Sequence, residues 1–315
     1  MDRLWKFQIE AVWNQRTIED FLRRHLNFTR RQISSLKFME DGIRLNGQKA
    51  GTTCRLHTDD RLTIHLLDRK SGDKTRIPSV SRTAFSPVVL YEDEDLLVAD
   101  KPAGLPVHPS RGHYGDTLLD FLRHNLSADG STLHPVGRLD KDTAGIVIIA
   151  RHRASAAALS SQLQNRQMEK TYLALAEGTF EAKAGEITAP IAPREGCLNQ
   201  MEISEKGKPA VTSYQVQKEY FSSEKGFPYS LLTCRLKTGR THQIRVHMAC
   251  TGHPLLGDPI YGITPNPLFP SLGLCAFSCS FYQPFTKKRI QVTTKQKEWC
   301  ILWNEFMKSR SGESP

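Results

Sequence analysis

One short stretch of the chain constrains its fold more than any other: a polar turn that leads directly into an apolar strand. The turn is formed by residues 136–145 (VGRLDKDTAG), and the apolar run over residues 146–150 (IVIIA) follows it. A short run rich in β-branched residues is typical of a buried strand. Asp140 then lies on a loop braced by a sheet, where proteins often display binding and catalytic groups. An isolated aspartate at such a place either caps the turn or takes part in chemistry.

Positive charge is concentrated in the first quarter of the chain. Residues 1–86 carry 17 Lys and Arg against 10 Asp and Glu, whereas the rest of the chain carries 26 against 23. A basic region of this kind predicts an anionic partner, most simply a nucleic acid. The alternative is a well-solvated surface on a basic protein.

The seven cysteines predict neither a disulfide framework nor a zinc ribbon, because their number is odd and no Cys-x-x-Cys pair occurs. Reduced thiols in a cytosolic protein are the simplest interpretation. The opening residues (MDRLWK) lack the apolar segment of a signal peptide, and no run approaches the ~18 apolar residues that span a bilayer. We therefore expect a cytoplasmic protein that does not engage a membrane.

The sequence carries no fingerprint of a cofactor site. Neither a G-x-G-x-x-G loop nor a G-x-x-x-x-G-K-[ST] loop occurs. His242 and His247 are five residues apart, but no third ligand with zinc spacing accompanies them. We therefore expect no cofactor and no metal.

Two short helices are expected near the N-terminus. Thr17 begins the first with a [ST]-x-x-[DE] pattern, and Thr29 begins the second. Arg30 and Arg31 in the first turn of the second helix oppose the helix dipole, so a phosphate ligand would explain them better than helix stability does. The expected buried residues are Phe21, Leu22 and Leu26 in the first helix and Ile33, Leu36 and Phe38 in the second.

A hairpin follows these helices. Residues 43–49 are expected to enter a turn at Asn46-Gly47, and alternating apolar residues over 62–66 predict a further strand. Two helices, a basic turn and a Leu-Asn-Gly hairpin resemble an S4 RNA-binding domain, with its core over about residues 15–67. The alternative is an ordinary amphipathic helix pair with solvated arginines. The resemblance implies that the following side chains face RNA: Arg30, Arg31, Lys37 and Arg44.

The 315 residues suffice for two domains. Residues 68–86 are polar and lack an apolar period, which predicts a linker between an S4-like domain over residues 1–67 and a second domain over residues 87–303. Residues 304–315 are expected to form a tail. In the second domain, many short strands with few helices favour an α+β fold over βαβ repeats.

Four motifs of the second domain resemble those of the RluA-type RNA pseudouridine synthases. They are residues 100–109 (DKPAGLPVHP), 138–145 (RLDKDTAG), 169–175 (EKTYLAL) and 236–248 (LKTGRTHQIRVHM), and they occur in the family's order. Three positions depart from the family pattern. Asp100 stands where Asn is usual, Gly137 where many members have His, and Cys275 where a His is usual.

The resemblance implies a pseudouridine synthase fold with a mixed, mainly antiparallel central sheet, and an enzyme that converts uridine in RNA to pseudouridine. In this family the aspartate at Asp140 is catalytic, the tyrosine at Tyr172 lies in the active site, and the arginine at Arg245 pairs with the aspartate. Asp140 either attacks C1′ or takes the 2′ proton, and the sequence leaves both routes open. The remaining residues expected to contact RNA near the site are Arg138, Arg240, His242 and Gln243.

Family members with an S4 module usually modify large-subunit (23S) ribosomal RNA, so this RNA is the expected substrate of a monomeric enzyme. Two rival functions are the alternatives. An S4-containing ribosome-assembly factor without catalysis would not require Asp140, Tyr172 and Arg245 to be intact. An S4-linked RNA methyltransferase would require a Gly-rich nucleotide loop, which the sequence lacks.

Overall fold

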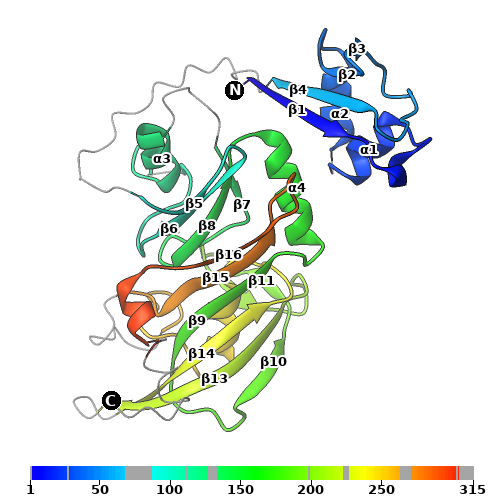
Figure 1. Ribbon diagram of the computed structural model, residues 1–315. Coiled ribbons are helices and arrows are strands. Elements are labelled where there is room, and N and C mark those ends of the chain that lie inside the picture. The colour runs from blue at the N-terminus through cyan, green and yellow to red at the C-terminus, as the bar shows by residue number, and fades with distance from the viewer. Residues whose placement is uncertain are drawn as a thin grey trace.

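The computed structural model describes residues 2–26, 28–67, 87–110, 113–126, 133–197, 199–222, 227–262, 271–302 and 304. These residues form a small N-terminal sheet with two helices and, beside it, a much larger sheet flanked by helices (Figure 1). The expected linker over residues 68–86 and nearly all of the expected tail over residues 304–315 lie outside the described residues.

The N-terminal sheet is antiparallel and has the order β1-β4-β2-β3. Its first strand pairs along its whole length with the last, from Gln8 opposite Arg61 to Asp2 opposite Leu67. The small domain therefore includes residues ahead of the core that the sequence predicts from about residue 15. Its elements are β1 (Asp2–Gln8), a 3-10 turn η1 (Ala11–Trp13), α1 (Ile18–Arg24), α2 (Arg30–Lys37), β2 (Ile43–Leu45), β3 (Gln48–Lys49) and β4 (Arg61–Leu67).

Local signals in the sequence position the two helices and the hairpin. Thr17 Oγ1 accepts a hydrogen bond from the backbone N–H of Asp20 at 3.1 Å, and Thr29 forms a reciprocal capping box with Gln32. Asn46 and Gly47 have φ angles of 52° and 84°, as a two-residue hairpin turn requires. The predicted helix starts and the predicted turn are confirmed.

The predicted burial of Phe38 is wrong. It was expected on the buried side of α2, but 84% of it is exposed, whereas Ile33 and Leu36 are 6% and 3% exposed. An α-helix turns by about 100° per residue, so a residue two positions after Leu36 lies on the far side of the helix. The helix also ends at Lys37, and Phe38 is its C-cap.

The large sheet has ten strands in the described residues, in the order β10-β13-β14-β9-β15-β8-β6-β5, with β16 paired to β15 and β7 to β8. Neighbouring strands are antiparallel except β15 and β8, which are parallel. The predicted α+β class with a mixed, mainly antiparallel sheet is confirmed. The strands are β5 (Val88–Glu92), β6 (Leu96–Lys101), β7 (His134–Val136), β8 (Ala144–Ala150), β9 (Glu169–Glu177), β10 (Ala184–Thr188), β13 (Val211–Ser222), β14 (Phe227–Leu236), β15 (Leu274–Tyr282) and β16 (Arg289–Thr293).

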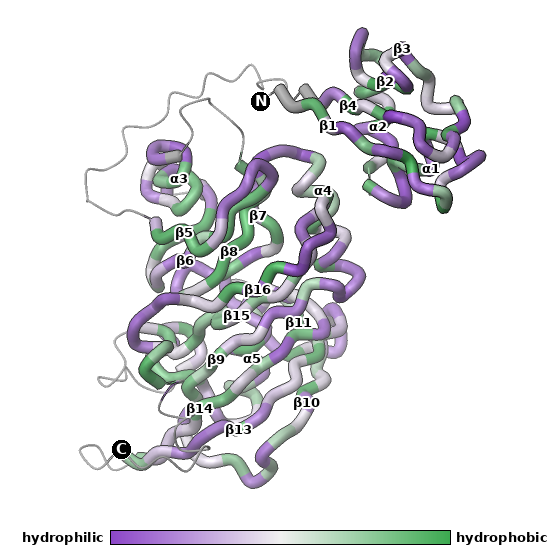
Figure 2. The backbone as a smooth tube through the Cα atoms, in the orientation of Figure 1, coloured by the Kyte–Doolittle hydropathy of each residue, from purple (hydrophilic) through white to green (hydrophobic). Residues whose placement is uncertain are grey.

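Strand β8 shows why the apolar run after the turn is continuous. All seven of its residues are buried. Ile146, Ile148 and Ala150 belong to one core cluster, and Val147 and Ile149 belong to a second, so both faces of the strand are covered. Figure 2 shows the strand coloured as hydrophobic. A strand that is buried on both faces has no position for a polar residue.

The elements outside the strand order are α3 (Leu118–Leu126), α4 (Arg153–Gln164), α5 (Gln243–Cys250), and the two-stranded pair β11 (Ile191–Pro193) and β12 (Met201–Ile203).

The small domain contacts the large one directly. The ring of Trp5 on β1 lies 3.8 Å from that of Phe285 and 5.6 Å from that of His152, measured between centroids. Gln32 on α2 donates a hydrogen bond to the carbonyl of Arg153 at 3.1 Å. The N-terminal domain is therefore packed against the start of α4 and the segment after β15.

Candidate active site

The catalytic candidate Asp140 lies on the loop between β7 and β8. The two strands pair with each other, and the backbone N–H of Thr143 donates to the carbonyl of Asp140 at 3.3 Å, which closes the turn. The carboxylate of Asp140 is 21% exposed, so it lies at a wall of the site rather than inside the core. The loop thus presents one carboxylate from a rigid sheet, as the sequence predicts.

A buried lysine holds this loop from behind. Lys101, at the end of β6, is fully buried and donates through Nζ to the carbonyls of Lys141 at 2.7 Å and Pro102 at 2.9 Å. Burial lowers the pKa of Lys101 to about 7, although the nearby carboxylates of Asp142 and Asp140 oppose that shift. The Lys-Pro motif therefore has a structural role beside the site that the sequence did not indicate.

Arg245, on α5, was expected to pair with Asp140, and the structure shows a long ion pair with Asp140 beside a closer pair with Asp258. One Nη lies 3.8 Å from Asp140, which is an electrostatic contact rather than a hydrogen bond. The guanidinium instead forms a two-pronged pair with Asp258, at 2.8 Å from Nε and 2.7 Å from the other Nη. Arg245 is 1% exposed and Asp258 is 5% exposed.

Asp258 is a site residue to which sequence reasoning gave no role. Burial raises its pKa, but the stronger combined effect of Arg245 and of the N–H groups of Ile260 and Tyr261 leaves the pKa of Asp258 below its usual value. Asp258 is therefore ionised at neutral pH and fixes the guanidinium of Arg245 beside Asp140. The resemblance to the family continues beyond residues 236–248 through Gly257-Asp258, and this continuation was the available signal.

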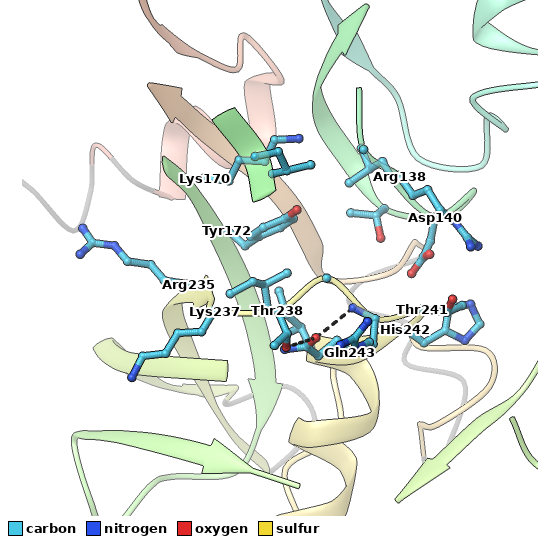
Figure 3. Close-up of a pocket in the computed structure, with 18 of the residues that line it drawn as sticks. Arg138, Asp140, Lys170, Tyr172, Arg235, Lys237, Thr238, Thr241, His242 and Gln243 are labelled. Atoms are coloured by element: carbon cyan, nitrogen blue, oxygen red, sulfur yellow. Dashed lines mark hydrogen bonds between the residues drawn. The ribbon is translucent and has the colours of Figure 1, made fainter. Parts of the chain in front are cut away.

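Tyr172 enters the site from the opposite side. It lies on β9, is 7% exposed, and belongs to the main core cluster. Burial, the largest cause, raises the pKa of Tyr172 well above its usual value, so the phenol is neutral. Figure 3 shows Tyr172 and the loop that carries Asp140 facing the same pocket, with His242 and Gln243 along a third side.

His242 is the residue directly before α5, which begins at Gln243. His242 adopts a left-handed conformation with φ of 55°, and its Nδ1 lies 2.9 Å from the hydroxyl of Tyr261. Burial lowers the pKa of His242. His247 shares no site with it, because both ring nitrogens of His247 contact other groups, Thr212 and the carbonyl of Ala189.

Gln243 was expected to contact RNA, and its surroundings argue otherwise. The side chain is 2% exposed. Its amide donates to Val211 and Thr212 at 3.0 Å each, and its carbonyl accepts from Thr238 and from the backbone N–H of Arg240. Gln243 therefore holds the Thr238–Gln243 turn in place, and its polar atoms are already satisfied within the protein.

These residues surround a pocket of about 810 Å³. Seven Lys and Arg residues line it, against two acids. Arg138 and Arg240, which were expected to contact RNA, are exposed among the lining residues, and Arg240 also donates to the carbonyl of Pro209 at 3.0 Å. Sequence reasoning missed four of the cations because they come from separate elements: Arg166, Lys170, Arg235 and Lys237.

The N-terminal cations do not join this pocket. Arg30, Arg31 and Lys37 lie on α2 and are exposed. Arg44 is held within its own hairpin, where it donates to Asp41 at 2.5 Å and to the carbonyl of Gly47 at 3.0 Å. The structure therefore separates the expected RNA contacts into a pocket and a distinct N-terminal surface.

Two of the departures from the family pattern occupy special positions. Gly137 has a φ of 78°, and a side chain there would meet Leu163 at 3.3 Å. Cys275 on β15 is fully buried and lies opposite Ala144 of β8. Burial raises the pKa of Cys275, so the thiol is neutral and inert at this position.

No helix in the described part of the chain is both long and apolar enough to cross a membrane. The seven cysteines are free thiols.

Comparisons with known proteins agree with this site. The chain matches the RNA pseudouridylate synthase family over residues 95–250 and the N-terminal domain of RluD ribosomal pseudouridine synthases over residues 5–62. The more specific S4 assignment of that domain stays a prediction. A protein of Aquifex aeolicus described as an uncharacterized RNA pseudouridine synthase is 35% identical over 295 residues, which are 89% of each chain.

Two further matches also carry the name of a pseudouridine or pseudouridylate synthase. A ribosomal large subunit pseudouridine synthase D of Nitrosomonas europaea is 43% identical over 221 residues, which are 69% of this chain and 61% of that protein. The solved structure of human RNA pseudouridylate synthase domain containing 1 matches with a TM-score of 0.57 at 26% identity, over 67% of this chain and 84% of that chain. The chain therefore belongs to the RluA/RluD family of RNA pseudouridine synthases, which are isomerases.

Proposed function

We propose that this pseudouridine synthase modifies large-subunit (23S) ribosomal RNA, that Asp140 is its catalytic carboxylate, and that it works as a monomer. The RNA substrate is inferred from the relatives named ribosomal large subunit pseudouridine synthase D, at 36–43% identity. The observation that carries the catalytic assignment is the placement of Asp140, Tyr172 and Arg245 around one pocket of about 810 Å³. A pocket of this size accommodates a nucleoside.

The reaction balances within the substrate. The N1–C1′ bond breaks, the uracil turns, C5 bonds to C1′, and the proton on C5 leaves while N1 gains one. The carboxylate of Asp140 either attacks C1′ or takes the 2′ proton, comparable to the carboxylate that meets the oxocarbenium-like centre of a glycosidase. Neither route exchanges electrons with a redox partner.

Arg245 acts on this chemistry through charge. Its fixed guanidinium, 3.8 Å from Asp140, places a positive charge beside the carboxylate that acts in either route. Because Asp258 already holds two of its nitrogens, Arg245 cannot swing away when RNA enters. Tyr172, neutral and packed in the core, offers a ring face for the displaced uracil and a hydroxyl for the proton step at C5.

The cations on the rim hold the RNA once the uridine has left its stack. Arg138 and Arg240 are exposed and lie beside the turn into α5. A flipped nucleotide exposes the phosphates on both of its sides, and guanidinium groups bind phosphate oxygens well. We assign the same task to Arg166 and Arg235, which also line the pocket and are exposed.

The N-terminal domain, over about residues 1–67, adds affinity for structured RNA and takes no part in the reaction of the catalytic domain over about residues 87–303. Arg30, Arg31 and Lys37 are exposed cations outside the pocket. Such contacts raise affinity for RNA of any sequence through counterion release.

The substrate is tested by mapping pseudouridines in ribosomal RNA from cells with and without the gene. Loss of one or a few modified positions in large-subunit RNA, restored by the wild-type gene but not by the Asp140→Asn gene, is the expected result. An unchanged large-subunit map together with altered transfer RNA would overturn the substrate and leave the reaction standing.

A further inference from the structure

The outward face of α2 combines an exposed aromatic ring with exposed cations. Ile33 and Leu36 pack into the domain core, and the opposite side of the helix carries the polar residues. At its C-terminal end Phe38 is 84% exposed, the largest value among the exposed large hydrophobic residues that the structure describes. The exposed residues of this face are Arg30, Arg31, Ser34, Ser35, Lys37 and Phe38.

The exposure of Phe38 is not required by the fold. Three other aromatic residues of the domain are used in its core, since Trp5, Phe21 and Phe28 are 6%, 2% and 4% exposed. A fully exposed Phe forfeits about 1.5–3 kcal/mol of burial free energy, which a polar residue at the same C-cap would not. An exposed aromatic ring beside exposed cations is the combination with which proteins bind single-stranded nucleic acids.

The charges around Phe38 suit an anionic partner. The first turn of α2 contains no acid, and Lys37 lies in its last turn. Within the described part of the chain, no ion pair ties Arg30, Arg31 or Lys37. Of the two acids that follow, Asp41 is neutralised by Arg44, which leaves only Glu40.

The spacing along the helix places the ring and the cations on one surface. Phe38 lies seven residues after Arg31 and four after Ser34, so the three share a face, and about 10 Å of helix separates Arg31 from Phe38. The residues between them on that face, Ser34 and Ser35, are small, so a polynucleotide backbone can approach the helix closely.

We propose that Phe38 stacks on an unpaired base of the RNA while Arg31 and Lys37 bind the phosphates next to it. This proposal rests on the proposed function, in which the N-terminal domain holds the RNA. The ligand class is a single-stranded nucleotide in a loop or bulge, because only an unstacked base offers its face to a side chain. The face of α2 thereby selects RNA with unpaired nucleotides, not duplex RNA alone.

The test compares full-length variants binding to two RNA probes, a hairpin with a large unpaired loop and a blunt duplex of the same length. Phe38→Leu keeps an apolar side chain and removes the ring, so it should weaken binding to the loop-containing hairpin by about 5- to 150-fold, the range of one aromatic–base stack. Binding to the duplex should be unchanged. Phe38→Trp should bind the hairpin at least as tightly as the wild type.

Two further measurements separate stacking from charge. Phe38→Leu should leave the salt dependence of binding unchanged, because no cation is removed, whereas Lys37→Ala should make it shallower. Val12→Ala, at another exposed apolar residue of the same domain, is the matched control and should bind both probes like the wild type. Urea unfolding of each variant checks that the domain is intact.

Equal affinity of Phe38→Leu and the wild type for the hairpin would overturn the proposal, as would equal losses on hairpin and duplex. A shift in sedimentation caused by Phe38→Leu, with RNA binding intact, would show that the ring contacts protein instead. If Arg30→Ala/Arg31→Ala/Lys37→Ala weakens RNA binding and Phe38→Leu does not, the stacking of Phe38 is overturned and the RNA-holding role of the domain stands. If neither variant weakens it, the RNA-holding role of the domain fails too.

Discussion

The pocket and the outward face of α2 both carry cations that we propose to bind RNA, but they hold them in opposite ways. In the pocket, Arg245 is 1% exposed and fixed by two hydrogen bonds to Asp258. On α2, Arg30, Arg31 and Lys37 project into solvent. A fixed, desolvated charge alters the chemistry of its neighbour, whereas an exposed charge is screened by salt and adds mainly affinity. We therefore propose that the reaction takes place in the pocket and that the face of α2 retains the RNA.

The largest effect is expected where the two regions differ most, at Asp140. Asp140→Asn keeps the shape of the side chain and removes both a nucleophile and a base, so turnover should fall by up to ~10⁶-fold. Tritium release from 5-labelled uridine in RNA measures it. Residual activity above about one per cent of wild type would contradict an essential role. Asp142→Asn, two residues further along the loop, is the matched control and should retain most activity.

The pair between Arg245 and Asp258 should matter for stability as well as for rate. Arg245→Ala leaves Asp258 buried without its partner, and breaking a buried pair costs on the order of 3–5 kcal/mol of unfolding free energy. Urea unfolding and single-turnover rates give the two quantities. Asp258→Asn should lower the rate while leaving Asp140 in place, because Arg245 is then no longer fixed. A variant Arg245→Ala as stable and as active as the wild type would show that the pair is dispensable.

The pH dependence of stability follows from the same pair. The pKa of Asp258 in the folded protein is below its usual value. Its contribution is therefore present above the usual carboxyl pKa and disappears as the pH falls through the lowered one. Asp258→Asn should flatten the acid limb of the stability curve relative to the wild type. An identical acid limb in both proteins would contradict the assignment.

The exposed cations of α2 should give a smaller effect, confined to binding. Arg30→Ala/Arg31→Ala/Lys37→Ala should raise the KM for structured RNA and leave kcat nearly unchanged. The slope of log affinity against log salt should become shallower by ~0.7–0.9 for each phosphate that is no longer neutralised. Arg44→Ala is a useful comparison, because its guanidinium is already held by Asp41 and should contribute less. A fall in kcat at saturating RNA would mean that this surface takes part in the reaction.

An effect confined to the pH dependence of stability is expected from Lys101, behind the catalytic loop. Its pKa in the folded protein is about 7, below the usual lysine value, so the unfolded chain binds more protons between these two pH values. Stability should therefore rise with pH from about 7 toward the usual lysine pKa, and Lys101→Met should flatten this rise. Lys37→Met, which removes one exposed positive charge, is the matched control. Chemical denaturation from about pH 6.5 to about pH 9.5 measures the slope of unfolding free energy against pH. Equal slopes in Lys101→Met and the wild type would show that Lys101 does not cause the rise.

Local features of the molecule could be predicted from the sequence because their causes are local. The caps at Thr17 and Thr29, the Asn46-Gly47 turn and the buried strand after Asp140 each depend on a few adjacent residues. The partner of Arg245 could not be assigned in this way, because Asp258 reaches it through a loop 13 residues further on. Arg166, Lys170 and Arg235 were missed for a related reason, since only the assembled sheet brings their strands and helix ends to one pocket. Phe38 was misplaced because an apolar residue was assigned to the core without following the turn of the helix.

The separation of reaction from retention is tested most directly by one crossed measurement on two full-length variants, Asp140→Asn and Arg30→Ala/Arg31→Ala/Lys37→Ala. For each, the dissociation constant for ribosomal RNA at moderate salt and the single-turnover rate at saturating RNA are measured beside the wild type. We predict that Asp140→Asn binds with wild-type affinity and does not react, and that the triple variant binds weakly but reacts at the wild-type rate. A triple variant that is slow even when saturated, or an Asp140→Asn protein that still forms pseudouridine, would contradict this division of labour.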